Sequence, residues 1–235
     1  MAAERLIAFG AEIWVAEGSV VSYLGFPYPT RMAIIRLADG GLFLWSPIAL
    51  TPSLQATVEA LGTVRYLVTP TKLHNLYLAE WKAAYPWAQL YAAPGLVQHR
   101  RDIAFDDRLM DKPPAAWANQ IDQVLVQGSF AITEVAFYHR ASETALIADL
   151  IQSFPPGWFK GWRGWIARRA GIVAPNAGTP LDLRATFTHR KAVRQSVKRI
   201  FDWGAEHLIL AHGPLVEEDA TGYMHKALSW VGLSA

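Results

Sequence analysis

The stretch YLVTPTKLH, residues 66–74, joins an apolar run to a polar turn that contains a proline. The run at Val64–Val68 is short and apolar, which is typical of a buried strand. Apolar residues at helical spacing precede it at Thr51–Leu61, and a helix is expected after it at Asn75–Ala84. A further apolar run at Gln89–Ala92 ends before a Pro-Gly pair. This alternation of helices and strands predicts sheets covered by helices.

The rest of the chain repeats the pattern of strands followed by helices. Strands are expected at Ile13–Val15, Val20–Leu24, Met32–Leu37, Leu42–Trp45, Asp122–Gln127, Thr133–Tyr138, Ala145–Leu150 and His207–Leu210. Helices are expected near Trp158–Ala170, Arg190–Trp203 and Ala220–Val231, and loops at Asp102–Asn119 and Ala174–Asp182. We therefore expect one α/β domain over residues 1–235.

The composition excludes several classes of protein. The 235 residues are 52% hydrophobic and 18% charged, with a mean hydropathy of +0.13, which excludes a disordered or coiled-coil chain. The chain has no cysteine, so a metal site would have to use histidine and carboxylate ligands. No apolar stretch reaches the roughly 20 residues of a membrane helix, and the amino terminus does not resemble a secretory signal. We expect a cytoplasmic protein.

Charge is distributed unevenly along the chain. Residues 157–200 hold ten basic residues and one acidic residue, a charge of +9, and the remaining 12 basic and 19 acidic residues give −7. Such a segment can attract an anionic ligand, a lipid surface or an acidic partner. A solvated basic helical face is the alternative.

Three polar side chains directly follow strand-like runs. His74 follows the run at Val64–Val68, Asp149 follows an apolar run, and His212 follows His207–Leu210. Ligands of open α/β sheets bind at the carboxyl ends of strands. The sequence has no G-x-S-x-G elbow, phosphate-binding loop or G-x-G-x-x-G fingerprint, so these three residues are the candidates for chemistry.

With these residues, the sequence resembles the metallo-β-lactamase superfamily, in an uncharacterised branch whose metal motif is eroded. In that superfamily an apolar strand leads into H-x-H-x-D-H and then into a helix and a strand. Here only the last histidine, His74, is present, and Thr69, Thr71 and Leu73 hold the other motif positions. Asp149 corresponds to the bridging aspartate and His212 to the terminal histidine. The middle histidine has no match.

The resemblance implies an αββα sandwich of two mixed sheets with outer helices. It also implies a metallo-hydrolase-like protein with a degenerate site, in which His74, Asp149 and His212 hold at most one zinc or iron ion. Such a site would give weak or specialised hydrolysis of an ester, thioester or amide. The alternative is a non-catalytic binding or interaction protein whose relict pocket binds no metal and takes a small molecule or an anion, the latter at Lys72 or the basic segment.

The segment Trp158–Arg169 combines tryptophans and cations. Trp158, Trp162 and Trp165 have helical spacing, although two glycines weaken an isolated helix. We expect this helix to cover the pocket or to join two subunits in a homodimer, and we do not expect it to lie on a membrane. No nucleic-acid-binding motif accompanies its cations, so nucleic acid is not an expected partner. His139 and His99 are expected to be surface residues.

Overall fold

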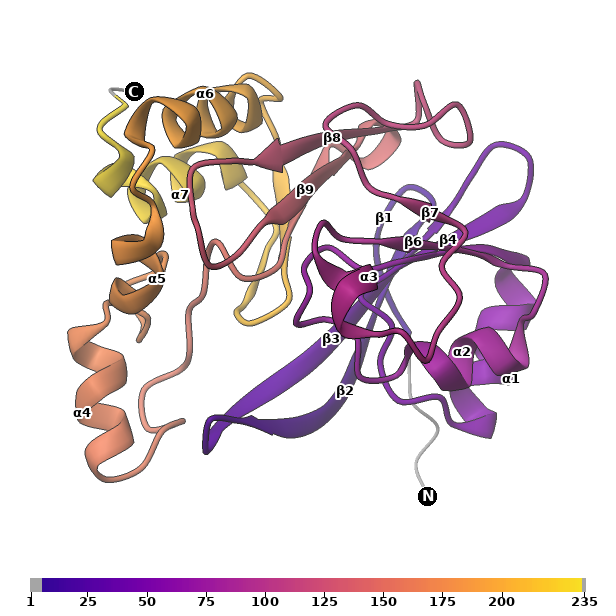
Figure 1. The fold of residues 1–235 in the computed structure, drawn as a ribbon, viewed down its shortest axis with the longest axis horizontal. Coiled ribbons are helices and arrows are strands. Elements are labelled where there is room, and N and C mark those ends of the chain that lie inside the picture. The colour runs from indigo at the N-terminus through magenta and orange to yellow at the C-terminus, as the bar shows by residue number, and fades with distance from the viewer. Residues whose placement is uncertain (1–5, 234–235) are drawn as a thin grey trace.

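The computed structural model describes residues 6–233, which form two mixed β-sheets packed face to face with helices on their outer sides (Figure 1). The first sheet has seven strands in sequential order: β1 (Ile7–Gly10), β2 (Ile13–Tyr23), β3 (Phe26–Arg36), β4 (Gly41–Trp45), β5 (Thr63–Val68), β6 (Gln89–Ala92) and β7 (Asp107–Arg108). The second has the order β12 (Leu215–Val216), β11 (His207–Leu210), β10 (Thr144–Ile147), β9 (Glu134–His139) and β8 (Ile121–Val126). This arrangement confirms the expected fold class.

Parallel pairing places several strand ends at one edge of the sandwich. Strands β4, β5 and β6 are parallel in the first sheet, and β10 and β11 are parallel in the second. The antiparallel bridge between Thr71 and Glu134 joins the loop after β5 to the start of β9. The loops that follow β5, β10 and β11 therefore meet between the two sheets.

The helices lie mainly on the outer faces. They are α1 (Pro52–Leu61), α2 (Leu78–Ala84), α3 (Leu96–His99), α4 (Trp162–Arg169), α5 (Leu181–Thr186), α6 (Arg190–Phe201) and α7 (Ala220–Ala227), with short 3-10 turns at Arg140–Ser142 and Ser229–Val231. The α1 helix begins where the Thr51 side chain accepts a hydrogen bond from the Leu54 amide, with Pro52 in the first turn. Across residues 6–233 no helix is long and apolar enough to cross a bilayer.

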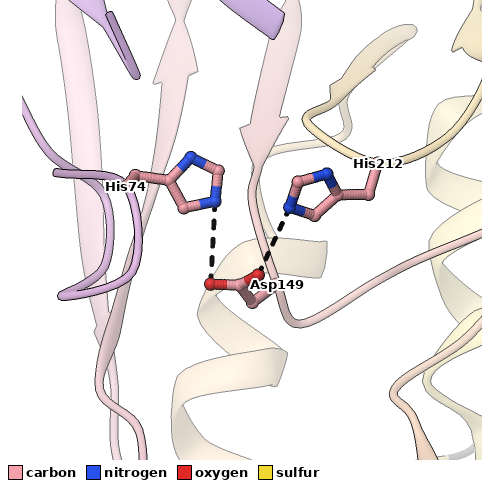
Figure 2. A group of neighbouring side chains, drawn as sticks. All are labelled: His74, Asp149 and His212. Atoms are coloured by element: carbon pink, nitrogen blue, oxygen red, sulfur yellow. Dashed lines mark ion pairs between the residues drawn. The ribbon is translucent and has the colours of Figure 1, made fainter. Parts of the chain in front are cut away.

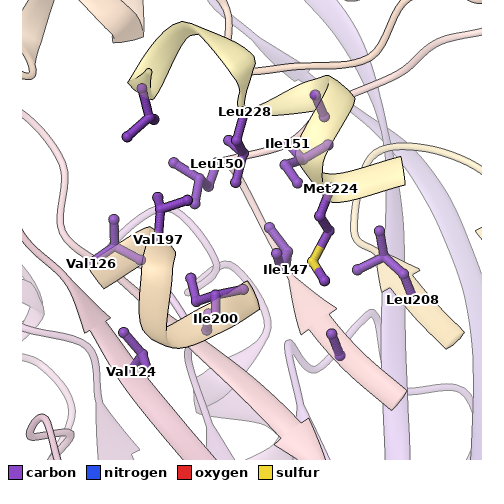
Figure 3. Packing of buried hydrophobic residues seen from close by; sticks show 14 of the residues in the cluster. Val124, Val126, Ile147, Leu150, Ile151, Val197, Ile200, Leu208, Met224 and Leu228 are labelled. Atoms are coloured by element: carbon purple, nitrogen blue, oxygen red, sulfur yellow. The ribbon is translucent and has the colours of Figure 1, made fainter. Parts of the chain in front are cut away.

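Three apolar layers hold the sandwich together. The middle layer packs residues such as Phe43 against Phe137, one from each sheet. An outer layer packs α6 and α7 on the second sheet, where Val193, Val197 and Ile200 of α6 are fully buried (Figure 3). Full burial of each such side chain contributes about 1.5–3 kcal/mol. The other outer layer packs α1 and α2 on the first sheet.

Several local expectations need correction. The α4 helix begins at Trp162, and the Trp158 indole nitrogen instead donates to the Pro27 carbonyl. The expected loop at Ala174–Asp182 overlaps the first two residues of α5. This helix is too short to show a helical period in the sequence. The prediction for His139 was wrong because this residue, 3% exposed, ends β9 with its ring turned inward against Ser142.

Candidate metal centre

The structure brings His74, Asp149 and His212 together although they come from three separate loops (Figure 2). One ligand atom from each residue lies within 4.8 Å of the other two. The His74 Nε2 atom is 3.7 Å from Asp149 Oδ2, and the His212 Nε2 atom is 3.6 Å from Asp149 Oδ1. The expected convergence of the three residues is therefore present.

These separations fit ligands of one ion better than direct hydrogen bonds. A nitrogen–oxygen hydrogen bond spans about 2.7–3.2 Å, shorter than either separation. Bonds from zinc to histidine and carboxylate of about 2.0–2.2 Å place two ligands of a tetrahedral ion about 3.4 Å apart. Within residues 6–233, no other group of three His, Cys, Asp or Glu residues meets the same geometric condition.

Each imidazole is held through its other nitrogen. The His212 Nδ1 atom lies 2.9 Å from the Pro29 carbonyl oxygen, so Nδ1–H donates and the Nε2 lone pair faces Asp149. The His74 Nδ1 atom lies 2.6 Å from Ser46 Oγ, at the end of β4. Partners of this kind fix the orientation of metal-binding histidines.

Arg31 holds the turn that carries His212. Its guanidinium, in a side chain 9% exposed, donates to the Leu210 carbonyl and, at 2.7 Å, to the Gly213 carbonyl. The Glu17 carboxylate pairs with the same guanidinium at 2.6 Å. This contact ties β3 of the first sheet to the loop after β11 of the second, so the position of His212 depends on the packing of the two sheets.

Asp149 lies in a buried turn just beyond β10. It is 4% exposed, and Thr71 Oγ1 donates to its Oδ2 atom at 2.8 Å. The backbone amides of Ala148, Asp149 and Leu150 donate to the carboxyl oxygens of Glu134 at 2.7–2.9 Å. Glu134 thereby fixes the turn that presents Asp149.

The protonation states suit a metal ligand set. Burial raises the pKa of Asp149, but the two facing imidazoles outweigh it and hold that pKa well below the ordinary value. Burial lowers the pKa of His212 below 6.5 despite its contact with Asp149, so this imidazole is neutral at pH 7. Burial and the Asp149 charge raise the pKa of Glu134 to about 8, although hydrogen bonds from the three backbone amides act to lower it. An ionised carboxylate and a neutral imidazole are the forms that bind metal ions.

The residues at the eroded motif positions have other roles. Thr69 accepts a hydrogen bond from the Ala93 amide at 2.9 Å and so joins the ends of β5 and β6. Thr71 contacts Asp149, and Leu73 lines the cavities beside the cluster. Hydroxyl and isobutyl groups do not replace imidazole or carboxylate as metal ligands.

Sequence reasoning missed the supporting residues Ser46 and Glu134. Their contacts with the cluster depend on how distant segments of the chain pack, which no local pattern reveals. Ser46 directly follows an expected strand, and this position was the available signal for it.

Comparison with solved structures shows that the fold is that of the metallo-β-lactamases. A metallo-β-lactamase from Pontibacter korlensis is 12% identical with a TM-score of 0.63, over 98% of this chain and 99% of that chain. The metallo-β-lactamase FIM-1 from Pseudomonas aeruginosa, in its mono-zinc form, is 12% identical with a TM-score of 0.62, over 98% and 96%. A putative diflavin flavoprotein A 5 fragment from Nostoc sp. PCC 7120 is 10% identical with a TM-score of 0.66, over 97% and 95%.

The sequence comparisons agree with an uncharacterised branch of this fold. No curated protein matches the chain. A family model described as a domain of unknown function matches residues 11–160, which is more than half of the chain and includes His74 and Asp149. The chain therefore belongs to the family Domain of unknown function (DUF4336).

Proposed function

We propose that this protein is a metallo-hydrolase with a single metal ion, held by His74, Asp149 and His212. The observation that carries the proposal is the placement of two imidazole Nε2 atoms around one buried carboxylate, with both Nδ1 atoms held from behind. Two histidines and one carboxylate suit zinc or ferrous iron and leave coordination positions open. The mono-zinc form of FIM-1 offers a precedent for one ion in this fold.

The surrounding residues would orient the ligands and limit access of water. Such an ion supplies Lewis acidity and a nucleophilic water at neutral pH. Thr71 holds one oxygen of Asp149 by its hydrogen bond. The Tyr28 ring packs edge-on against the His212 ring, with centroids 5.0 Å apart, and covers that side of the imidazole. The expected reaction is hydrolysis of an ester, thioester or amide at a weak or specialised level.

The second candidate is a binding protein that uses the same pocket without catalysis. The threonines and leucine at positions 69, 71 and 73 favour it, because they remove ligands that a two-metal hydrolase needs. An interaction through the basic segment at 157–200 belongs to this alternative.

Hydrolysis assays with matched variants separate the two candidates. Protein loaded with zinc or ferrous iron should hydrolyse at least one ester, thioester or amide, and a chelator should abolish the activity. His212→Ala and Asp149→Asn should lose at least about tenfold in activity, in line with the loss expected when the support of a metal site is disturbed. His99→Ala removes an exposed histidine outside the cluster and should retain activity. Activity that survives both the chelator and His212→Ala would contradict the proposal.

A further inference from the structure

Two unequal cavities meet at the candidate metal centre. The smaller has a volume of about 260 Å³ and is lined by His74, Asp149 and His212. The larger has a volume of about 710 Å³ and is also lined by Asp149. Gln152 lines both, is 4% exposed, and its amide oxygen has no hydrogen-bond partner among the described residues. This buried oxygen is free to accept a hydrogen bond from a bound molecule at the junction.

The larger cavity has a mostly apolar wall built from distant segments. Its apolar residues come from the tip of the β2–β3 hairpin, the loop between β8 and β9, α4, the loop after α4, and α5. They include Leu24, Ile132, Trp165, Ile166, Ile172 and Leu183. The hairpin tip extends toward α4 (Figure 1), and the Phe26 and Trp162 rings meet edge-on with centroids 5.6 Å apart. The volume falls within the roughly 300–1,000 Å³ of small-molecule sites. A wall of this kind suits an aliphatic or aromatic body.

The smaller cavity has more polar side chains in its wall. It is lined by Ser22, Thr30, Ser46, Asn75 and Tyr77 in addition to the cluster. The wall of the larger cavity also has polar side chains, among them Lys72, Arg169, Asp182 and Thr186, but it holds more apolar residues. A polar leaving group would find hydroxyl and amide partners in the smaller cavity, and an apolar chain would find more apolar residues in the larger one.

Lys72 places a cation in the wall of the larger cavity. It follows Thr71, which contacts Asp149, so the backbone of Lys72 lies at the end of the cavity nearest the cluster. Its amine forms no ion pair with any carboxylate in the part of the chain that the structure describes. A carboxylate at this end of an apolar chain would give the amine a charged partner.

We propose that the larger cavity binds the aliphatic chain of a fatty acid and of its acyl ester, thioester or amide, with the carboxylate of the acid at Lys72. This substrate class rests on the proposed hydrolase function. Water adds its oxygen to the acyl carbon, the bond from that carbon to the leaving oxygen, sulfur or nitrogen breaks, and the leaving atom takes a proton. The polar leaving group lies in the smaller cavity, and the product acid remains in the larger one.

Binding of free fatty acids tests the site without any requirement for metal or activity. Chelator-treated protein is titrated with saturated fatty acids of increasing length, by calorimetry and by displacement of a fluorescent fatty acid. Affinity should rise about fourfold per added methylene until the cavity is full. Lys72→Gln should weaken binding of the acids and leave binding of the corresponding alcohols unchanged.

Two cavity-filling variants and one control variant test whether the aliphatic chain of the fatty acid lies in the larger cavity. Ala170→Trp and Ala131→Trp introduce an indole from two different segments of the wall and should each weaken long-chain binding at least about tenfold. Ala185→Trp adds the same side chain at an exposed position of α5 outside the wall and should bind as the wild type does. Circular dichroism identifies any variant that fails to fold. If one of the two cavity-filling variants does not fold, the fatty-acid affinity of the other tests the site.

The outcomes separate this inference from the proposed function. Binding that does not depend on chain length, or that both fillers leave unchanged, would overturn the inference. Length-dependent binding that both fillers weaken would support it. If that binding occurs while the metal-loaded protein hydrolyses no acyl substrate, the fatty-acid site in the larger cavity is supported and the hydrolase proposal fails.

Discussion

Thr71 Oγ1 lies 2.8 Å from Asp149 Oδ2, which joins two residues 78 positions apart in a fully buried contact. In the metallo-β-lactamase motif that this sequence resembles, the position of Thr71 belongs to a histidine. The side chain at this position therefore supports the proposed ligand Asp149 and offers no imidazole of its own. The same contact helps to keep the Asp149 carboxylate turned toward His74 and His212.

Removal of the Thr71 hydroxyl should weaken metal binding. Thr71→Val keeps the shape of the side chain but leaves Asp149 Oδ2 without its donor, and loss of such support typically costs 10–100-fold in metal affinity. Thr71→Ser keeps the hydroxyl and should bind zinc nearly as the wild type does. Competition with a chromophoric chelator measures both affinities. Equal affinity for wild type and Thr71→Val would show that this hydrogen bond does not support the site.

The order of the main elements was predictable because each has a local signal. The Thr51 cap with Pro52 marks the start of α1, and the apolar run before His74 marks β5. The three residues of the cluster were also predictable, since each follows a strand. The residues that support the cluster were not predictable, because the contacts of Ser46 with His74 and of Glu134 with Asp149 span 28 and 15 residues.

The errors have physical causes as well. His139 precedes a charged turn, which suggested a surface position, but the alternation along β9 turns its ring inward. The α4 helix begins after Gly161, whose positive φ of 59° breaks the stripe that Trp158 was expected to begin. Short elements such as β12 and α5 depend on tertiary contacts more than on local pattern.

His139 should make the protein less stable as the pH falls. Burial lowers the pKa of His139 from 6.5 to about 4, so between these values the unfolded chain takes up a proton that the folded chain does not. Stability is therefore lost below pH 6.5, by about 2 kcal/mol at pH 5 for this residue. Urea unfolding of wild type and His139→Gln at pH 7 and pH 5 measures the difference. The same pH dependence in both proteins would exclude His139 as its source.

Glu134→Gln should destabilise the fold. Three backbone amides donate to the two carboxyl oxygens of Glu134. The N–H₂ group of glutamine cannot accept from them, so it leaves buried donors unpaired. The expected loss of unfolding free energy is about 3 kcal/mol. Glu143→Gln makes the same change at an exposed position and serves as the control for urea unfolding. Equal loss in both variants would contradict the role given to Glu134.

The exposed face of α4 should mediate self-association. Trp162 is 59% exposed, and Lys160, Arg163, Arg168 and Arg169 lie on or beside the helix. Burial of the indole in a second copy removes apolar surface from water, while screening of the like charges by salt should favour the dimer. Sedimentation equilibrium should show a dimer that salt strengthens and Trp162→Ala weakens. A monomer at every concentration, or strong binding to anionic vesicles that Trp162→Ala abolishes, would contradict this prediction.

The metal content of the purified protein tests the central claim most directly. Protein prepared without chelator and dialysed thoroughly should hold about one equivalent of zinc or iron per chain, since the cluster of His74, Asp149 and His212 could supply three ligands to one ion. Asp149→Asn and His212→Ala should retain well below half an equivalent, and His99→Ala should match the wild type. A content near two equivalents, or a content that neither Asp149→Asn nor His212→Ala lowers, would contradict a single ion at this site.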